Sequence, residues 1–197
     1  MAVMFNDTSS PLSLLKTRRS GKPRDLVAPG PSPDQLREMV GLAARTPDHG
    51  KLFPWRFVIV PGDQRAALAQ KLGDILMAEK QGCGPRDVEA AEQFATQAPA
   101  LVVVLSTPVQ GHKVPVWEQE LSAGAAAMNL LHAAHAMGFA GGWLTGWAAY
   151  SDAVRDLFGK PGERIAGFVF IGTPARELEE RPRPELSEIV HFWASQG

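Results

Sequence analysis

Helix-length amphipathic segments alternate along this chain with short, isolated apolar runs. The helical spacing is clearest over residues 63–80 and 117–137, and the apolar runs at 100–105 and 165–171 have the composition of buried strands. A helix or a sheet can bury its apolar side only against another element, so the helices are expected to cover a sheet. With 197 residues the chain has room for one such core, which predicts a single domain over residues 1–197, a three-layer α/β or α+β sandwich.

The sharpest local signal is a helix start at Ser32. Ser32 is a suitable N-cap, Pro33 takes the first helical position and Gln35 stands where a capping box needs it. Apolar residues follow at helical spacing, and Pro47 is expected to end the helix. Further helices are expected over residues 12–18, 87–96 and 151–158, and further strands over 57–60 and 139–144.

The C-terminal part of the chain carries large apolar side chains beyond the final expected strand. They include Ile189, Val190, Phe192 and Trp193, at the end of a charged, proline-rich tail. Exposed apolar groups of this size usually mark a surface that binds another protein. A second subunit is therefore the expected partner of the tail.

Composition excludes several classes of protein. A formal net charge of −1 gives no general reason to expect a nucleic acid or an anionic membrane as partner. Cys83 is the only cysteine, so no intrachain disulfide can form and a reducing compartment is indicated. Residues 1–11 lack the pattern of a signal peptide, and the apolar stretches at 98–105 and 124–137 are too short or too interrupted to span a bilayer. We expect a cytoplasmic protein with no nucleic-acid or membrane partner.

The familiar catalytic and nucleotide-binding motifs do not occur in the sequence. It has no G-x-G-x-x-G after a strand, no G-K-[ST] phosphate loop and no G-x-S-x-G turn. His132 and His135 lie three residues apart on one expected helix, but no second pair of ligands accompanies them, so a structural or interface role is favoured over a metal site. Glu118 and Glu120 point to different faces of that helix and are interpreted as charges that suit its N-terminus. We therefore expect no metal and no catalytic side chain.

The first candidate site is Arg18-Arg19-Ser20, at the end of the opening helix and just before a glycine. Two guanidinium groups and a hydroxyl offer a phosphate both charge and directed donors, and each charge-assisted bond contributes about 1.5–3 kcal/mol. A basic helix C-terminus that merely suits the helix dipole explains the same residues, and spacing alone favours that explanation.

Two further segments have the character of binding loops. Residues 45–55 join a helix end to a strand start and place Arg45 and His49 in one short loop. Residues 138–146 hold four glycines around Trp143. Glycine weakens a strand unless a backbone or a ligand comes close, so main-chain N–H groups facing a flat ring and a close helix–strand contact are equally favoured.

In this order, these segments resemble the nitroreductase family of FMN-dependent NAD(P)H oxidoreductases, most closely its short bacterial branch. The resemblance runs from about residue 14 to residue 184 and depends on the ordered combination rather than on any one motif. The motifs are Arg18-Arg19-Ser20, Pro47-Asp48-His49, Pro54-Trp55, His112-Lys113-Val114-Pro115 and Trp117-Glu118-Gln119-Glu120.

The resemblance implies a nitroreductase-like α+β fold, a three-layer α/β/α sandwich with a central mixed, mostly antiparallel sheet. It also implies an intertwined homodimer, in which two chains exchange terminal segments, bury their long helices against each other and bind FMN at the interface. The FMN-binding residues would be Arg18, Arg19, Ser20, Arg45, His49, Trp143, Leu144, Thr145, Arg181 and Arg183. The first three and the last two would hold the phosphate end, the second pair would reach the flavin, and residues 143–145 would lie against the isoalloxazine.

The implied activity is electron transfer from NAD(P)H to nitroaromatic or similar small electrophilic acceptors by a ping-pong mechanism. Flavin N5 carries that chemistry, which agrees with the lack of a catalytic side chain. Reduction of a quinone, an enone or a small aldehyde, a non-catalytic FMN-binding protein, and a flavin-free interaction domain are the alternatives. Lys51 and Phe53 stand where the wider family often has Asn and Gln, and Leu144 where the short branch can have Arg, so the acceptor is left open.

Overall fold

The computed structural model describes residues 4–194 and contains one five-stranded sheet. Its strands are β1 (Leu26–Val27), β2 (Trp55–Val60), β3 (Ala100–Ser106), β4 (Ala140–Leu144) and β5 (Arg164–Pro174). β5 pairs with β1, β3 and β4, and β3 pairs in addition with β2. Every pairing within the described residues is antiparallel, so the expected mostly antiparallel sheet is confirmed and no parallel pair occurs in this part of the chain.

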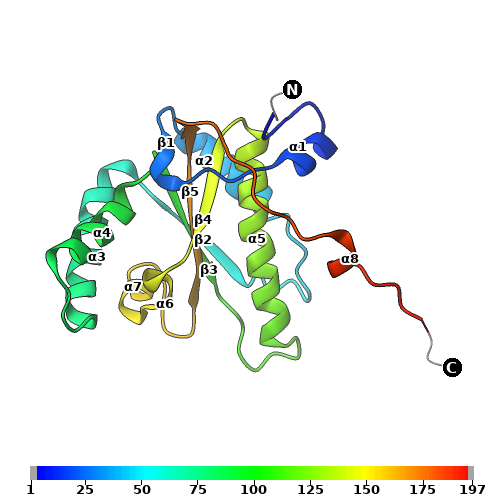
Figure 1. Ribbon diagram of the computed structural model, residues 1–197. Helices are drawn as coiled ribbons and strands as arrows, with labels where there is room; N and C mark the ends of the chain where they lie inside the picture. Colours follow the sequence, from blue (N-terminus) through cyan, green and yellow to red (C-terminus); the bar gives the residue numbers. More distant parts are fainter. Residues whose placement is uncertain (1–3, 195–197) are drawn as a thin grey trace.

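Helices cover both faces of this sheet, which confirms the three-layer α+β sandwich. The helices are α1 (Pro11–Thr17), α2 (Pro33–Ala43), α3 (Arg65–Glu79), α4 (Pro85–Thr96), α5 (Val116–Ala136), α6 (Trp147–Tyr150), α7 (Asp152–Asp156) and α8 (Leu186–Ile189), with 3₁₀ turns η1 (Pro23–Asp25) and η2 (Gly62–Gln64). Figure 1 shows α3, α4, α6 and α7 on one side of the sheet and α5 on the other, where α2 packs beside it.

The helix start at Ser32 forms as expected. The Gln35 main-chain N–H donates to Ser32 Oγ at 3.2 Å, and the Ser32 N–H donates to Gln35 Oε1 at 2.9 Å. The helix ends at Ala43, four residues before Pro47, because Thr46 Oγ1 donates to the Ala43 carbonyl and closes the last turn with its side chain.

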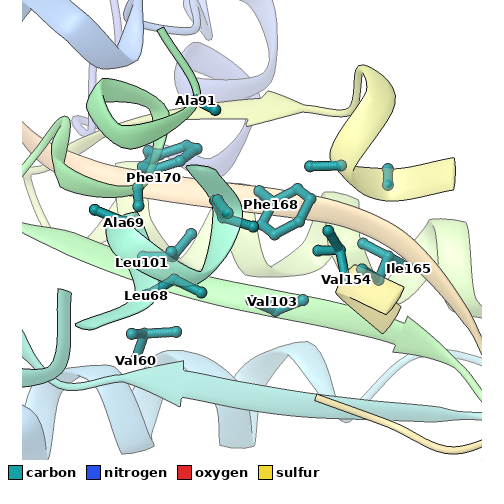
Figure 2. Packing of buried hydrophobic residues seen from close by; sticks show 14 of the residues in the cluster. Val60, Leu68, Ala69, Ala91, Leu101, Val103, Val154, Ile165, Phe168 and Phe170 are labelled. Atoms are coloured by element: carbon teal, nitrogen blue, oxygen red, sulfur yellow. The ribbon is translucent and has the colours of Figure 1, made fainter. Parts of the chain in front are cut away.

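Alternation along β3 and β5 divides the buried residues into two cores. On one face Leu101 and Val103 pack with Phe168 and Phe170 beneath α3 and α4 (Figure 2). Phe94 of α4 meets both of these phenylalanine rings edge-on, with centroids 5.0 and 5.3 Å away. On the other face, strand residues Val102, Val104, Val169 and Ile171 pack against α2 and α5. A strand whose two faces both contribute to a core is expected to be buried along its whole length, and every residue of β3 is buried.

Several short elements were not expected from the sequence, among them β1 and α6. β1 has two residues and α6 a single turn, so neither is long enough to show a period. None of the helices within residues 4–194 combines the length and apolarity needed to cross a membrane.

The tail leaves the body of the molecule after β5, as Figure 1 shows in orange and red. It carries α8 and then Phe192 and Trp193, whose side chains are 94% and 89% exposed. Large apolar groups held this far from the core have no partner among the described residues of their own chain.

Candidate functional site

A cavity of about 810 Å³ lies between the segment after α1, the edge strand β4, helix α5 and the tail. Its lining includes seven residues expected from the sequence, Arg18, Arg19, Ser20, Trp143, Leu144, Thr145 and Arg181. Three segments that are far apart in the sequence therefore meet at one place. The other expected residues, Arg45, His49 and Arg183, do not line this cavity.

The Arg18–Ser20 turn is held by residues before α1. Asn6 Oδ1 accepts the Arg19 main-chain N–H at 2.7 Å, and Asn6 Nδ2 donates to the Arg19 carbonyl at 3.2 Å. With both main-chain groups of Arg19 held, the turn presents Arg18 and Ser20 together, and Arg18 Nη1 donates to Ser20 Oγ at 3.1 Å. The turn is a preformed group of donors rather than a frayed helix end.

Like charges gather at this turn. Burial lowers the pKa of Arg18, and the positive charges of Arg183, Arg19 and Arg181 lower it further, against a smaller opposing effect of Glu180. Crowded guanidinium groups favour an anion between them, and their planar forks suit phosphate. Of the two interpretations of the Arg18 segment, the anion site is the one that this geometry supports.

The glycines of β4 are required by the packing of the chain itself. A Cβ atom on Gly141 would lie 2.7 Å from Leu131 Cδ2, and one on Gly142 would lie 2.6 Å from the Gly21 carbonyl oxygen. A close contact within the chain thus accounts for both glycines. Because they lack side chains, β4 can lie directly against the Arg18 segment.

The Trp143 side chain is anchored on the sheet. Its indole Nε1 donates to the Ala166 carbonyl at 3.0 Å, and the ring covers Gly167, where a Cβ atom would lie 1.8 Å from Nε1. The indole N–H is therefore already used by the fold, and a ligand at this wall would meet the main chain of β4 and the side chains of Leu144 and Thr145.

His132 and His135 lie one helical turn apart on α5, close to Arg18. His135 is fully buried, and its Nε2 accepts the Gly141 main-chain N–H at 3.2 Å. Burial lowers the pKa of His135 to about 4, with smaller contributions from Arg18 and His132. Burial and Arg18 also lower the pKa of His132. Within residues 4–194 no three His, Cys, Asp or Glu side chains are grouped as metal ligands, and the bond to Gly141 gives His135 a structural role.

Arg45 and His49 lie away from the cavity. His49 Nδ1 is 2.7 Å from Glu118 Oε2, in the first turn of α5. At 1.5 Å per residue, Glu118 is about 15 Å along α5 from Met128, the nearer of the two α5 residues that line the cavity. Arg45 follows α2 and is exposed to solvent. One chain alone does not bring these two residues to the anion site.

Arg183 lies just outside the lining. Its Nη2 donates to Glu180 Oε1 at 3.2 Å. Its positive charge is close enough to Arg18 to lower the pKa of that side chain, which lines the cavity. The tail that carries Arg181 and Arg183 is held at the site by Arg19, whose Nε donates to the Glu179 carbonyl at 2.5 Å.

The cavity also contains residues that the sequence did not indicate. These are Gly21, Lys22, Pro23, Arg24, Gln97, Met128 and Leu131, whereas Gly142 belongs to the glycine-rich segment that the sequence did indicate. Lys22 and Arg24 continue the basic run of Arg18 and Arg19, which is a signal that was available. Gln97 had none, because its place is set by Arg65, whose Nη2 donates to the Gln97 carbonyl at 2.7 Å from the start of α3.

These features define a class: a three-layer α+β protein with a basic cavity between a glycine strand and a long, alanine-rich helix. The sequence profile of the nitroreductase family matches residues 15–173, and the chain belongs to this family. It is 36% identical over 164 residues to YdjA of Escherichia coli K12, provisionally named an NAD(P)H nitroreductase, covering 83% of this chain and 87% of that protein. A protein of Haemophilus influenzae with the same provisional name is 37% identical over 176 residues, 87% of this chain and 92% of the other.

Solved structures share the fold at lower identity. A nitroreductase-like family protein from Bacillus cereus superimposes with a TM-score of 0.81 and 20% identity over 98% of both chains. A nitroreductase-type protein from Desulfovibrio desulfuricans, solved in complex with FMN, gives a TM-score of 0.69 and 21% identity over 93% of this chain and 98% of that one.

Proposed function

We propose that this protein is an FMN-dependent NAD(P)H oxidoreductase that reduces nitroaromatic or similar small electrophilic acceptors by a ping-pong mechanism. The observation that carries the proposal is the group of guanidinium side chains, Arg18, Arg19 and Arg181, crowded at one end of a cavity. Membership of the nitroreductase family and the names of the relatives support the same activity.

The residues that line the cavity fit FMN. Its volume of about 810 Å³ lies in the range of ligand and cofactor sites. The phosphate would lie between Arg18, Ser20 and Arg181, where it relieves the repulsion that lowers the pKa of Arg18. The flat ring would lie along the main chain of β4, with Leu131 behind it.

We infer that a second copy of the chain completes the site. α5 exposes an apolar stripe that begins with Trp117 and Leu121, 66% and 53% exposed, and the tail exposes Phe192 and Trp193. A homodimer would remove both apolar surfaces, the stripe on α5 and the tail, from water. Arg45 and His49, which do not reach the cavity of their own chain, would then reach the flavin of the other.

FMN supplies the chemistry, because it accepts a hydride from NAD(P)H and passes electrons to the acceptor. The protein positions the ring and adjusts its charge. Arg45 or Lys51 would place positive charge beside the pyrimidine end, where reduction adds negative charge. No side chain needs to act as a nucleophile. The same proposal places the protein in the cytoplasm, in keeping with its single cysteine.

An absorption spectrum of the purified protein, recorded before and after anaerobic NADPH and paired with its mass in solution, tests this proposal. We expect a yellow dimer that NADPH bleaches and that a nitroaromatic compound restores. A colourless monomer in excess FMN would refute the proposal. Yellow protein that NADPH cannot bleach would identify a non-catalytic FMN-binding protein, and a steady-state screen of quinones, enones and aldehydes separates the related reductases.

A further inference from the structure

The buried His135 connects the longest helix to the wall of the cavity. Its Nε2 accepts the main-chain N–H of Gly141 at 3.2 Å, in the first part of β4. Its Nδ1 is buried without a partner among the described residues. An acceptor at Nε2 requires the neutral ring, with its single proton on Nδ1.

Gly141 also contacts the segment that follows the Arg18–Ser20 turn. Its carbonyl accepts the main-chain N–H of Gly21 at 3.1 Å, so the N–H of Gly141 is bonded to α5 and its carbonyl to the Arg18 segment. The next residue, Gly142, lies so close to Gly21 that a Cβ atom would be 2.6 Å from the Gly21 carbonyl oxygen. Gly21 directly follows Ser20, and Gly21 and Gly142 both line the cavity.

We propose that neutral His135, protonated on Nδ1, is a positioning residue for the cofactor site, which holds Gly141 in place so that Gly21 and the Arg18–Ser20 turn keep their distance from β4. This role rests on the proposed function, because the group that the turn binds is taken to be FMN. His135 touches no ligand itself. It acts through Gly141 and Gly21.

The surroundings of His135 keep the ring neutral. The ring is fully buried, and the charged or titratable groups close enough to affect it are Arg18 and His132, both of which oppose a positive charge on it. Protonation would place a second N–H against the Gly141 N–H, so the hydrogen bond cannot survive in the charged form.

Three variants of the full-length protein separate this role from general stability. His135→Gln keeps an uncharged acceptor that can reach Gly141, whereas His135→Leu fills the site without one. Leu130→Ala removes a fully buried side chain from the same helix that lines no part of the cavity, and it serves as the destabilised control.

FMN dissociation constants at pH 7.5, followed by quenching of flavin fluorescence, give the first result. We expect His135→Leu to weaken FMN binding roughly tenfold, as the loss of one buried hydrogen bond does. His135→Gln and Leu130→Ala should stay within about twofold of wild type. Equal weakening in Leu130→Ala and His135→Leu, or no rescue by His135→Gln, would overturn the positioning role.

The ring ¹⁵N shifts of His135 in histidine-labelled protein, with and without FMN, give a second result that needs neither activity nor a stable leucine variant. We expect the Nδ1–H form at neutral pH. A proton on Nε2 would overturn the proposal. Wild-type protein that binds no FMN would instead refute the proposed function and the positioning role with it, whereas the ring shifts would still report on the bond to Gly141.

Discussion

The turn after α1 and the loop at residues 45–55 are both polar connections that follow a helix, yet they are built very differently. The turn is held from two sides, by Asn6 at Arg19 and by Gly141 at Gly21. The loop reaches outward: the side chains of His49 and Phe53 are about two-thirds exposed, at 67% and 63%. In the function proposed above, the turn is the half of the FMN site that one chain completes, and the loop is the half that would meet the FMN of a second chain.

Backbone conformation sharpens this comparison. In the loop, Lys51 and Phe53 have φ values of 55° and 49°, in the left-handed region that costs a residue with a side chain roughly 1–2 kcal/mol. The Phe53 N–H donates to Asp48 Oδ2 at 2.7 Å, which helps to hold the strained shape. A loop kept in such a shape while its side chains face solvent is typical of a functional surface. Four predictions test the division into two halves.

The largest effect is expected at the tail. Phe192→Ala combined with Trp193→Ala removes two aromatic groups that we place in the subunit interface, each contributing about 2 kcal/mol when buried. The dimer should weaken by about 4 kcal/mol, roughly a thousandfold in its dissociation constant, as measured by sedimentation equilibrium. FMN should be lost in parallel. Met77→Ala, which removes an apolar side chain that is 53% exposed on α3, is the control. An unchanged dimer would remove the tail from the interface.

The second largest effect is a pH dependence at His135, which contacts the turn after α1 through Gly141. The pKa of His135 falls from 6.5 to about 4 on folding, so the unfolded chain takes up the proton first. The contribution of neutral His135 to the unfolding free energy is fully present above pH 6.5. It is lost as the pH falls towards 4, and the total loss is roughly 3 kcal/mol. Urea unfolding of wild type and His135→Gln should diverge across this window, with a flatter dependence in the variant. Parallel curves would contradict the depressed pKa.

The third prediction addresses the anion site. Arg18→Ala should raise the dissociation constant for FMN about thirtyfold, the value of one charge-assisted hydrogen bond of about 2 kcal/mol. The unfolding free energy of the FMN-free variant should not fall, since the substitution also removes like-charge repulsion. Arg37→Ala is the matched control, because Arg37 is exposed and forms its ion pair with Asp34, away from the cavity. Equal FMN affinities in the two variants would rule out Arg18 as a phosphate ligand.

The smallest effect is expected at the loop. His49→Ala should lower kcat about fivefold, or about 1 kcal/mol, because an exposed polar group adjusts the flavin without performing a chemical step. Glu118→Gln tests whether the contact to His49 matters on its own. Complete loss of turnover in His49→Ala with FMN still bound would make this histidine essential and would contradict a reaction carried by the flavin.

Local signals in the sequence predicted most of the fold. Ser32 and Gln35 form the expected capping box, and the apolar run at 100–105 is the fully buried β3. The sequence could not show which residues of β3 face which core, because a strand buried on both sides does not alternate in polarity. It also could not show β1, which exists because β5 runs on to Pro174 and offers it a partner.

The sequence indicated which segments contribute to the candidate site, but it did not indicate how these segments are arranged in space. The Arg18 turn and residues 143–145 line one cavity, and their assignment to FMN stays a prediction. The reason for the β4 glycines was left open by the sequence, since contact with Leu131 and Gly21 depends on tertiary packing. The length of α5 was expected from the sequence, but the position of His49 beside the first turn of that helix depends on a tertiary contact with Glu118.

The central position of β5 has a consequence for how the polypeptide is made. β5 pairs with three other strands and contributes Phe168, Phe170, Val169 and Ile171 to the two cores, yet it is the last strand to be synthesised within residues 4–194. β2 and β3 can pair once both have emerged from the ribosome, whereas β1 must wait for a partner that emerges much later and β4 for the strand that follows it. A nascent chain that stops before Arg164 can close neither core, so folding must wait until β5 has been synthesised, and the earlier apolar strands need protection from aggregation until then.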